Sequence, residues 1–269
     1  RLRQFTISEG HLMCTPEQLE EEFKNCLELA IFMLKTVGLF EDATYRFSQW
    51  DPNNREKYIG SPEDWERMQG KMKAILDHLE IPYTIGVGEA AFYGPKLDIQ
   101  IKNVWGKEDT LITIQIDQMI AEKFGMVYTD KDGVKRNPII IHRTSIGCYE
   151  RTLAYLIEKY AGAFPTWLSP VQAIVMNVSE KSEDYAHNVC QKLKDAGFRV
   201  EEDLRAEKIG YKIRSAQMQK IPYMVIIGEN EANNGTISIR KRGNIEVKDL
   251  KLEDLVSELN DKISNRILD

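Results

Sequence analysis

The strongest constraint on the fold is a change in the pattern of predicted secondary structure at one segment, Phe164-Pro165-Thr166-Trp167-Leu168-Ser169-Pro170. Two prolines within these seven residues exclude a continuous helix or an interior strand. Strand-like stretches dominate before the segment, whereas strands and helices alternate after it. A chain of 269 residues is also long enough for two domains. We therefore predict one domain at residues 1–163, a linker at residues 164–170 and a second domain at residues 171–269.

The first domain is predicted to be an α+β domain built on an antiparallel sheet. Turn residues such as Gly94-Pro95 separate several strand-like stretches, which favours antiparallel pairing of neighbouring strands. The expected strands span residues 1–13, 83–88, 96–101, 110–117 and 138–142.

Three helices are predicted in the first domain from start signals and apolar spacing. Thr15 is the expected N-cap of the first helix, with Gln18 completing a capping box, and Gly38 ends it. Ser61-Pro62-Glu63-Asp64 carries the same kind of start signal for the second helix. The third helix is expected at residues 146–160. Its apolar stripe consists of Ile146, Leu153, Leu156 and Ile157.

The second domain is predicted to be an α/β domain with a mostly parallel sheet. Its elements follow one another as strand, helix, strand, helix and strand, which is typical of helices packed on parallel strands. The expected strands span residues 171–177, 198–201, 223–227 and 236–241, and the helices span residues 183–196, 209–220 and 252–267.

Composition and charge are those of a globular protein in a reducing cytoplasm. The four cysteines are far apart and form no CxxC pair, and no apolar run is long enough for a membrane span. The first residue is Arg1 and no secretory leader follows it, so we expect a part of a longer chain. The net charge of -6 argues against indiscriminate nucleic-acid binding. Residues 205–242 nevertheless carry eight basic and three acidic side chains, which indicates a local basic surface or a solvated face.

Two histidines are candidate metal ligands. His11 and His142 both lie at the ends of strand-like segments, where distant parts of a sheet can converge. Two histidines are one ligand short of a zinc site, and Cys14 is a conceivable third. From these residue types alone, packed histidines are the more common outcome.

Other segments could line a cleft for a polar ligand. Tyr93 and Lys96 lie in a glycine-rich stretch, and Arg151 follows a strand-to-helix junction where its guanidinium can pair with phosphate. The alternatives are a glycine-rich hairpin and a structural Glu–Arg ion pair. Three polar side chains alternate with isoleucines and therefore face one way, toward solvent or toward a cleft. They are Thr113, Gln115 and Asp117.

These segments, taken in order, resemble the threonyl-tRNA synthetases, a family of class II aminoacyl-tRNA synthetases. Residues 1–6 resemble the end of motif 2, and Gly147-Cys148-Tyr149-Glu150-Arg151 resembles motif 3. Further similarity to this family lies at residues 88–96, 113–117, 141–143, 164–168 and 203–210. The resemblance implies the last part of a class II catalytic domain followed by an anticodon-binding domain.

For ATP, the resemblance implies that Arg1 and Arg151 act as catalytic residues by contacting phosphate. Phe5 would stack on adenine, and Thr110 would also line the ATP site, with Mg²⁺ bound alongside the nucleotide. Fixed cationic donors suit adenylate formation because negative charge develops on phosphate oxygens. Motif 1 and most of motif 2 have no counterpart in these residues, so we expect the chain alone to be inactive.

For the amino acid, the resemblance implies that His11 and His142 are two of three Zn²⁺ ligands and face the same small volume beside Arg151. The third ligand of the family is a cysteine upstream of motif 2, which Cys14 does not match. Such a zinc binds the amino and hydroxyl groups of threonine and thereby selects against valine. Glu9 stands where many members have an aspartate that holds the substrate amino group. The remaining substrate-binding residues would be Tyr93, Lys96, Thr113, Gln115 and Asp117.

For tRNA, the resemblance implies that Arg214, Glu231 and Arg240 contact anticodon bases. A glutamate can accept a hydrogen bond from a base, and an arginine can donate to guanine. The implied partners are tRNA(Thr), ATP and threonine, with a homodimer for the longer protein and no membrane. The implied reaction is ATP-dependent threonylation. Two alternatives stay open: a non-catalytic RNA-binding module, and another class II synthetase such as the prolyl, glycyl or histidyl enzyme.

Overall fold

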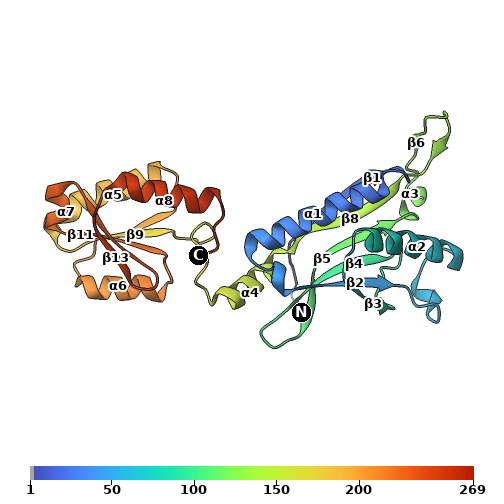
Figure 1. The fold of residues 1–269 in the computed structure, drawn as a ribbon, viewed down its shortest axis with the longest axis horizontal. Helices are drawn as coiled ribbons and strands as arrows, with labels where there is room; N and C mark the ends of the chain where they lie inside the picture. Colours follow the sequence, from blue (N-terminus) through green and yellow to red (C-terminus); the bar gives the residue numbers. More distant parts are fainter. Residues whose placement is uncertain (1–2) are drawn as a thin grey trace. The chain divides into compact units, whose positions relative to one another are not determined.

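The computed structural model describes residues 3–269. The chain divides into two compact units, whose bounds are Arg1–Glu158 and Lys159–Asp269 (Figure 1). Arg1 and Leu2 lie outside the described residues. No helix within the described part of the chain is long and apolar enough to cross a membrane.

The first unit is built on a six-stranded sheet. All neighbouring strands pair antiparallel except β2 and β3, which are parallel. Helix α2 connects these two strands and returns the chain to the same end of the sheet. The antiparallel pairing predicted for the strand at residues 83–88 is therefore wrong, because this strand pairs in parallel with β2. Strand β2 itself was not predicted. The strand order is β1 (Ile7–Cys14), β8 (Ile139–Cys148), β5 (Glu108–Asp117), β4 (Lys96–Lys102), β2 (Ala43–Gln49) and β3 (Tyr83–Val87).

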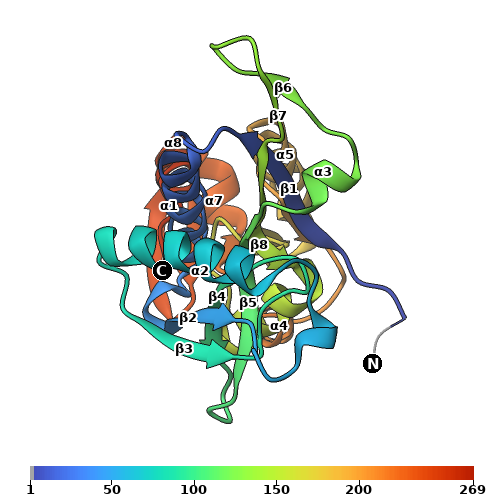
Figure 2. The same ribbon diagram turned by 90° about the vertical axis from the view of Figure 1, so that its right-hand side faces the viewer.

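One face of this sheet is apolar and the other is polar. Helix α1 (Leu19–Val37) packs against β8 and β5, and α2 (Pro62–His78) lies over the same face (Figures 1 and 2). Side chains alternate along a strand, so the isoleucines of β5 are buried under the helices while the residues between them face the other way. The buried side chains on the helix side include Phe47, Leu97, Ile99, Ile112, Ile114, Ile116 and Ile141.

The predicted helix starts have mixed outcomes. Ser61 caps α2, and the predicted reciprocal bonds with Asp64 are present. The Gln18 side chain accepts from the Thr15 N–H as expected, but residues 15–18 form a turn and α1 begins at Leu19, so Thr15 is not the N-cap. Gly38 ends α1, as predicted, and it does so in the left-handed conformation.

The third helix, α4 (Tyr149–Tyr160), starts later than expected because β8 extends through Cys148. Ile146 therefore belongs to the strand. The predicted apolar stripe is wrong in part, since Leu153 and Ile157 are about half exposed. The side chains that α4 buries are Thr152, Tyr155 and Leu156.

Short elements complete the first unit. A hairpin of β6 and β7 extends away from the main sheet (Figure 2). The bounds are α3 (Ile120–Lys123), β6 (Tyr128–Thr129) and β7 (Lys135–Arg136), with 3₁₀ turns at Phe40–Asp42 and Arg55–Lys57.

The second unit is a five-stranded sheet with helices on both faces (Figure 1). β10, β9 and β11 are parallel, whereas β12 and β13 extend the sheet as an antiparallel hairpin. Helices α5 and α8 cover one face and α6 covers the other. The hairpin strand β13 and the short helix α7 were not predicted. The bounds are β9 (Ala173–Asn177), α5 (Glu183–Asp195), β10 (Val200–Asp203), α6 (Ile209–Met218), β11 (Tyr223–Ile227), α7 (Glu229–Asn234), β12 (Ile237–Lys241), β13 (Ile245–Leu250) and α8 (Leu252–Ser264), with a 3₁₀ turn at Glu180–Ser182.

Gly147 is required where β8 ends. Its φ is +74°, and a Cβ atom at this position would lie 1.8 Å from the carbonyl oxygen of Leu111. We expect Gly147→Ala to lower the free energy of unfolding of the first unit by about 3 kcal/mol or more, because positive φ and a backbone clash act together. Urea denaturation measures this. Gly106→Ala is the control, since Gly106 has a similar φ of +77° with open space around it. Equal losses in the two variants would contradict the clash.

Candidate active site

The polar face of the first sheet carries a row of side chains that crosses five strands. The strand register places each member directly opposite the next, so their side chains share one face and lie close to their neighbours. From β1 to β2, this first row consists of His11, His142, Gln115, Lys96 and Ser48.

A second polar row runs beside the first, on the same face. Glu9 lies opposite Thr144, and the Thr113 N–H donates to the Thr144 hydroxyl at 3.0 Å. Thr113 lies opposite Asp98, and Asp98 lies opposite Arg46. The two rows bring together most of the residues that the sequence assigns to amino-acid binding.

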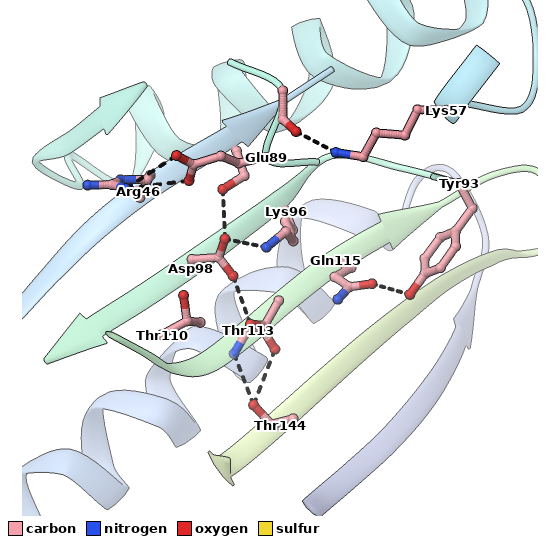
Figure 3. Close-up of polar contacts among 12 residues, drawn as sticks. Arg46, Lys57, Glu89, Tyr93, Lys96, Asp98, Thr110, Thr113, Gln115 and Thr144 are labelled. Atoms are coloured by element: carbon pink, nitrogen blue, oxygen red, sulfur yellow. Dashed lines mark hydrogen bonds and ion pairs between the residues drawn. The ribbon is translucent and has the colours of Figure 1, made fainter. Parts of the chain in front are cut away.

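Asp98 connects the two rows and was missed in the sequence (Figure 3). Only 1% of it is exposed, and its Oδ2 accepts from the Ser48 hydroxyl at 2.7 Å and from the Lys96 ammonium at 2.5 Å. Its Oδ1 accepts from the Thr113 hydroxyl at 2.8 Å. A buried carboxylate without such donors would be strongly destabilising. By accepting from all three donors, the Asp98 carboxylate holds Lys96 and Thr113 in fixed positions.

The loop between β3 and β4 carries Tyr93 over this face. Arg46 pairs with Glu89 at 3.4 Å, and the Lys57 ammonium donates to the carbonyl oxygen of Gly88 at 2.5 Å (Figure 3). Gly94 approaches the backbone of β5 so closely that a Cβ there would lie 2.1 Å from the carbonyl oxygen of Ile116. Only glycine allows this approach, which fixes the position of the loop.

Tyr93 donates a hydrogen bond to Gln115 Oε1, and its ring centre lies 5.1 Å from that of His142. Burial raises the pKa of Tyr93 to about 12, and the negative charges of Asp117 and Glu9 add to the rise. The phenol therefore keeps its proton at neutral pH and acts as a hydrogen-bond donor.

The two candidate metal ligands are adjacent. The ring centres of His11 and His142 are 4.6 Å apart. The fully buried Asp117 accepts from two backbone N–H groups at the start of α3 and lies 3.1 Å from His142 Nε2. Because this carboxylate accepts the Nε2 proton, the lone pair of His142 is on Nδ1. Nδ1 faces Glu9, whose Oε1 lies 4.0 Å away.

This donor set fits a zinc ion. One nitrogen from each histidine and one oxygen from Glu9 lie within 4.8 Å of one another, and zinc prefers such nitrogen and oxygen ligands. Cys14 does not join them. It is three residues from His11 on β1 and is buried with the apolar side chains, and burial raises the pKa of its thiol to about 11. The interpretation of Cys14 as a conceivable third ligand is therefore wrong.

A cavity of about 730 Å³ adjoins the polar rows. Phe5, Thr110 and Arg151, three of the predicted ATP-binding residues, line it together, and the Arg151 guanidinium donates to the carbonyl oxygen of Thr110. The predicted partner Arg1 lies outside the described residues. The histidines are not among the lining residues, whereas Thr113 and Thr144 of the second polar row are, so the cavity borders the polar face without including the histidine pair.

The three predicted anticodon residues lie on one face of the second sheet. Arg240 is opposite Met224, whose side chain packs under α6, the helix that carries the exposed Arg214. Glu231 accepts from the Ser238 hydroxyl at 2.7 Å and from the Gly228 N–H at 2.9 Å. Burial alone would raise the pKa of Glu231, but these hydrogen bonds outweigh it and lower the pKa.

The basic surface of this unit is smaller than the sequence indicates. Lys212 is only 1% exposed, and its ammonium donates to the backbone oxygens of Asn177 and Asp203. Arg205 pairs with Asp203 at 2.6 Å. Lysines counted as surface charge can thus serve as internal hydrogen-bond donors, which composition does not reveal.

Two family models match the chain. Residues 1–160 match the tRNA synthetase class II core domain (G, H, P, S and T), and residues 172–262 match the anticodon binding domain. The chain belongs to the class II tRNA synthetases.

Its relatives include threonine–tRNA ligases. The ligase of Clostridium perfringens is 59% identical over 266 residues, and that of Geobacillus kaustophilus is 42% identical over 267 residues. Each match covers 99% of this chain but only 41% of the relative, so the chain spans less than half of their length.

Solved structures show the same fold. The RNA binding domain of threonyl-tRNA synthetase from Cryptosporidium parvum matches with a TM-score of 0.89 at 34% identity, covering 97% of this chain and 64% of that one. A prolyl-tRNA synthetase from the same organism matches at 15% identity with a TM-score of 0.66, covering 99% of this chain and 51% of that one, and shows the fold alone.

We expect Asp98→Ala to lower the free energy of unfolding of the first unit by about 3 kcal/mol, because it leaves a largely buried ammonium and two hydroxyl groups without their acceptor. Ser48→Ala removes only one of the donors and should cost about 1 kcal/mol. Urea denaturation followed by tryptophan fluorescence measures both. Asp132→Ala, in an exposed turn, is the control. A loss for Asp98→Ala no larger than for the control would contradict the role of this carboxylate.

Proposed function

We propose that this chain is part of a threonine–tRNA ligase, which activates threonine with ATP and transfers it to tRNA(Thr). The observation that carries the proposal is the pair of rings of His11 and His142, 4.6 Å apart on a polar face beside the 730 Å³ cavity. The 59% identity to a threonine–tRNA ligase supports the same function.

In the proposed mechanism the cavity binds ATP with its Mg²⁺. Phe5 stacks on the adenine, the strand around Thr110 lines the nucleotide site, and Arg151 together with Arg1 stabilises the negative charge that develops on phosphate oxygens. No covalent enzyme intermediate is needed, because positioning and charge stabilisation promote attack of the threonine carboxylate on the α-phosphate, which gives threonyl-adenylate and releases pyrophosphate. We expect the 269 residues alone to be inactive, because the resemblance finds no counterpart in them of motif 1 and most of motif 2, which complete the ATP site in the family.

At the amino-acid end, His11 and His142 would hold a zinc ion. Bound there, zinc would supply a Lewis-acid centre for the amino and hydroxyl groups of threonine. Valine lacks the hydroxyl group and would therefore bind less well. Tyr93, Gln115 and Lys96 line the neighbouring surface. Asp117 orients His142 by accepting its Nε2 proton, and the Asp98 network keeps Lys96 and Thr113 in place.

The second unit would bind the anticodon through Arg214, Glu231 and Arg240. The carboxylate of Glu231 already accepts two hydrogen bonds, which leaves lone pairs for one base donor. A homodimer of the longer protein and a cytoplasmic location stay predictions.

A second candidate function is RNA binding without catalysis. It is favoured by the likeness to a threonyl-tRNA synthetase structure named as an RNA binding domain, at a TM-score of 0.89. Activity of the chain within a longer protein distinguishes this candidate from the ligase.

The ligase proposal is tested by replacing the matching residues of the Clostridium perfringens enzyme with this chain. We expect the chimera to threonylate tRNA(Thr), and Arg151→Ala in it to slow threonine-dependent ATP–pyrophosphate exchange about 100-fold or more. Lys131→Ala, in the exposed hairpin, is the control. A folded chimera that binds tRNA but does not threonylate it would favour the non-catalytic alternative.

The anticodon proposal predicts that Arg240→Ala weakens tRNA(Thr) binding by the chain. Loss of one base contact should reduce the affinity about tenfold. Filter binding at several salt concentrations measures it, with circular dichroism to check folding, since Arg240 also pairs with Glu246. The control is Lys192→Ala, which removes an equal charge from α5 on the opposite face. Equal affinities of the two variants would argue against this surface.

A further inference from the structure

We propose that Glu150 is a positioning residue of the nucleotide site, because its carboxylate fixes the backbone of Thr6 and thereby holds Phe5 in place for stacking on adenine. This inference deepens the proposed function and rests on it, since Phe5 is the adenine-stacking residue there. A structural Glu–Arg ion pair was the alternative for this part of the sequence. Within residues 3–269, Glu150 forms no ion pair with an arginine and instead accepts hydrogen bonds.

Both backbone groups of Thr6 are bound by the start of α4. The Thr6 N–H donates to the Glu150 carboxylate, at 3.2 Å from Oε1 and 3.0 Å from Oε2. The Thr6 carbonyl oxygen accepts from the Tyr149 N–H at 3.0 Å. A hydrogen bond to a carboxylate is about twice as strong as one between neutral groups. Two adjacent residues of the helix therefore hold the chain on both sides of Thr6.

Phe5 has few other anchors. Its side chain is 54% exposed, and neither Phe5 nor the two residues before it form a hydrogen bond with another described residue. Strand β1 begins only at Ile7. The bonds of Thr6 are thus the nearest points at which the backbone of Phe5 is fixed. An aromatic ring on an unfixed backbone must lose conformational entropy before it can stack, which weakens nucleotide binding.

The first turn of α4 reaches two walls of the cavity. Phe5, Thr110, Glu150 and Arg151 all line it, and the Arg151 guanidinium donates to the carbonyl oxygen of Thr110. Glu150 and Arg151 are neighbours in the sequence, so one helical turn binds both the segment that carries Phe5 and the strand that carries Thr110. This turn therefore sets the spacing between the adenine-stacking ring and the arginine that binds phosphate.

The negative charge of Glu150 is already satisfied by donors. Besides the Thr6 N–H, the Cys148 thiol donates to Oε2 at 3.2 Å, and a position in the first turn of a helix favours an anion. The hydrogen bond from Thr6 is the largest cause that lowers the pKa of Glu150, so the carboxylate is ionised at neutral pH. The proposed role needs an acceptor oxygen, which a glutamine side chain also has.

The experiment uses the chimera with the Clostridium perfringens enzyme and measures threonine-dependent ATP–pyrophosphate exchange. We expect Glu150→Ala to raise the KM for ATP about tenfold and the KM for threonine less than about twofold, because only the adenine end loses its anchor. Glu150→Gln should stay within about threefold of the unmodified chimera, since it keeps an acceptor.

Glu158→Ala is the matched control. Glu158 lies in the same helix, and its carboxylate also accepts a backbone N–H, that of Val104, at 3.2 Å. It does not line the 730 Å³ cavity, so we expect an unchanged KM for ATP. Hydrogen exchange of the peptide that contains residues 3–8 should be faster in Glu150→Ala but not in Glu158→Ala. Equal hydrogen exchange in the two variants would contradict the anchoring of Thr6.

A double-mutant cycle separates positioning of Phe5 from a general loss of structure. If Glu150 acts through Phe5, Glu150→Ala should raise the KM for ATP no further in a chimera that already carries Phe5→Ala. Additive effects of the two changes, or an unchanged KM in Glu150→Ala alone, would overturn the role of Glu150 and leave the proposed function intact. A folded chimera without ATP–pyrophosphate exchange would overturn the proposed function, and this inference with it.

Discussion

The register of six strands is the constraint on which the first unit depends. Residues more than a hundred positions apart become neighbours only because β1 pairs with β8 in one particular register, with His11 opposite His142. A shift of one residue would turn His11 toward the apolar helices and expose the leucine beside it. The buried isoleucines of β5 and β8 strongly disfavour that shift, so the same apolar packing that stabilises the sheet also aligns the polar side chains of the site.

A polar face beside a packed core requires that its buried charges have partners. Asp98 and Asp117 are two fully buried carboxylates on this face of the sheet, and each accepts at least three hydrogen bonds or close polar contacts. Asp98 holds Lys96 and Thr113, whereas Asp117 orients His142. Neither carboxylate needs to touch a substrate to matter, because both determine which atoms the neighbouring side chains present to the cleft.

Local signals in the sequence predicted much of the fold but not its pairings. Proline, glycine and capping residues correctly marked the start of α2 and the end of α1, and β11 was predicted with its observed bounds. Strand β2 was missed although Thr44, Arg46 and Ser48 alternate with apolar residues there. The stripe of α4 was misjudged because Leu153 and Ile157 are apolar but face away from the sheet. Periodicity shows that a helix has a buried side, but contacts decide which side it is.

The sequence by itself determined the fold class, the order of most elements and the residue types available for chemistry. It also placed the polar side chains of β5 on one face, since alternation along a strand is a local property. Tertiary structure alone decided that Asp98 lies between Lys96 and Thr113, that Cys14 faces the core, and that Glu9 lies beside two histidines from different strands. These are relations between strands, and strand pairing depends on apolar burial summed over the whole sheet, which no short segment of sequence contains.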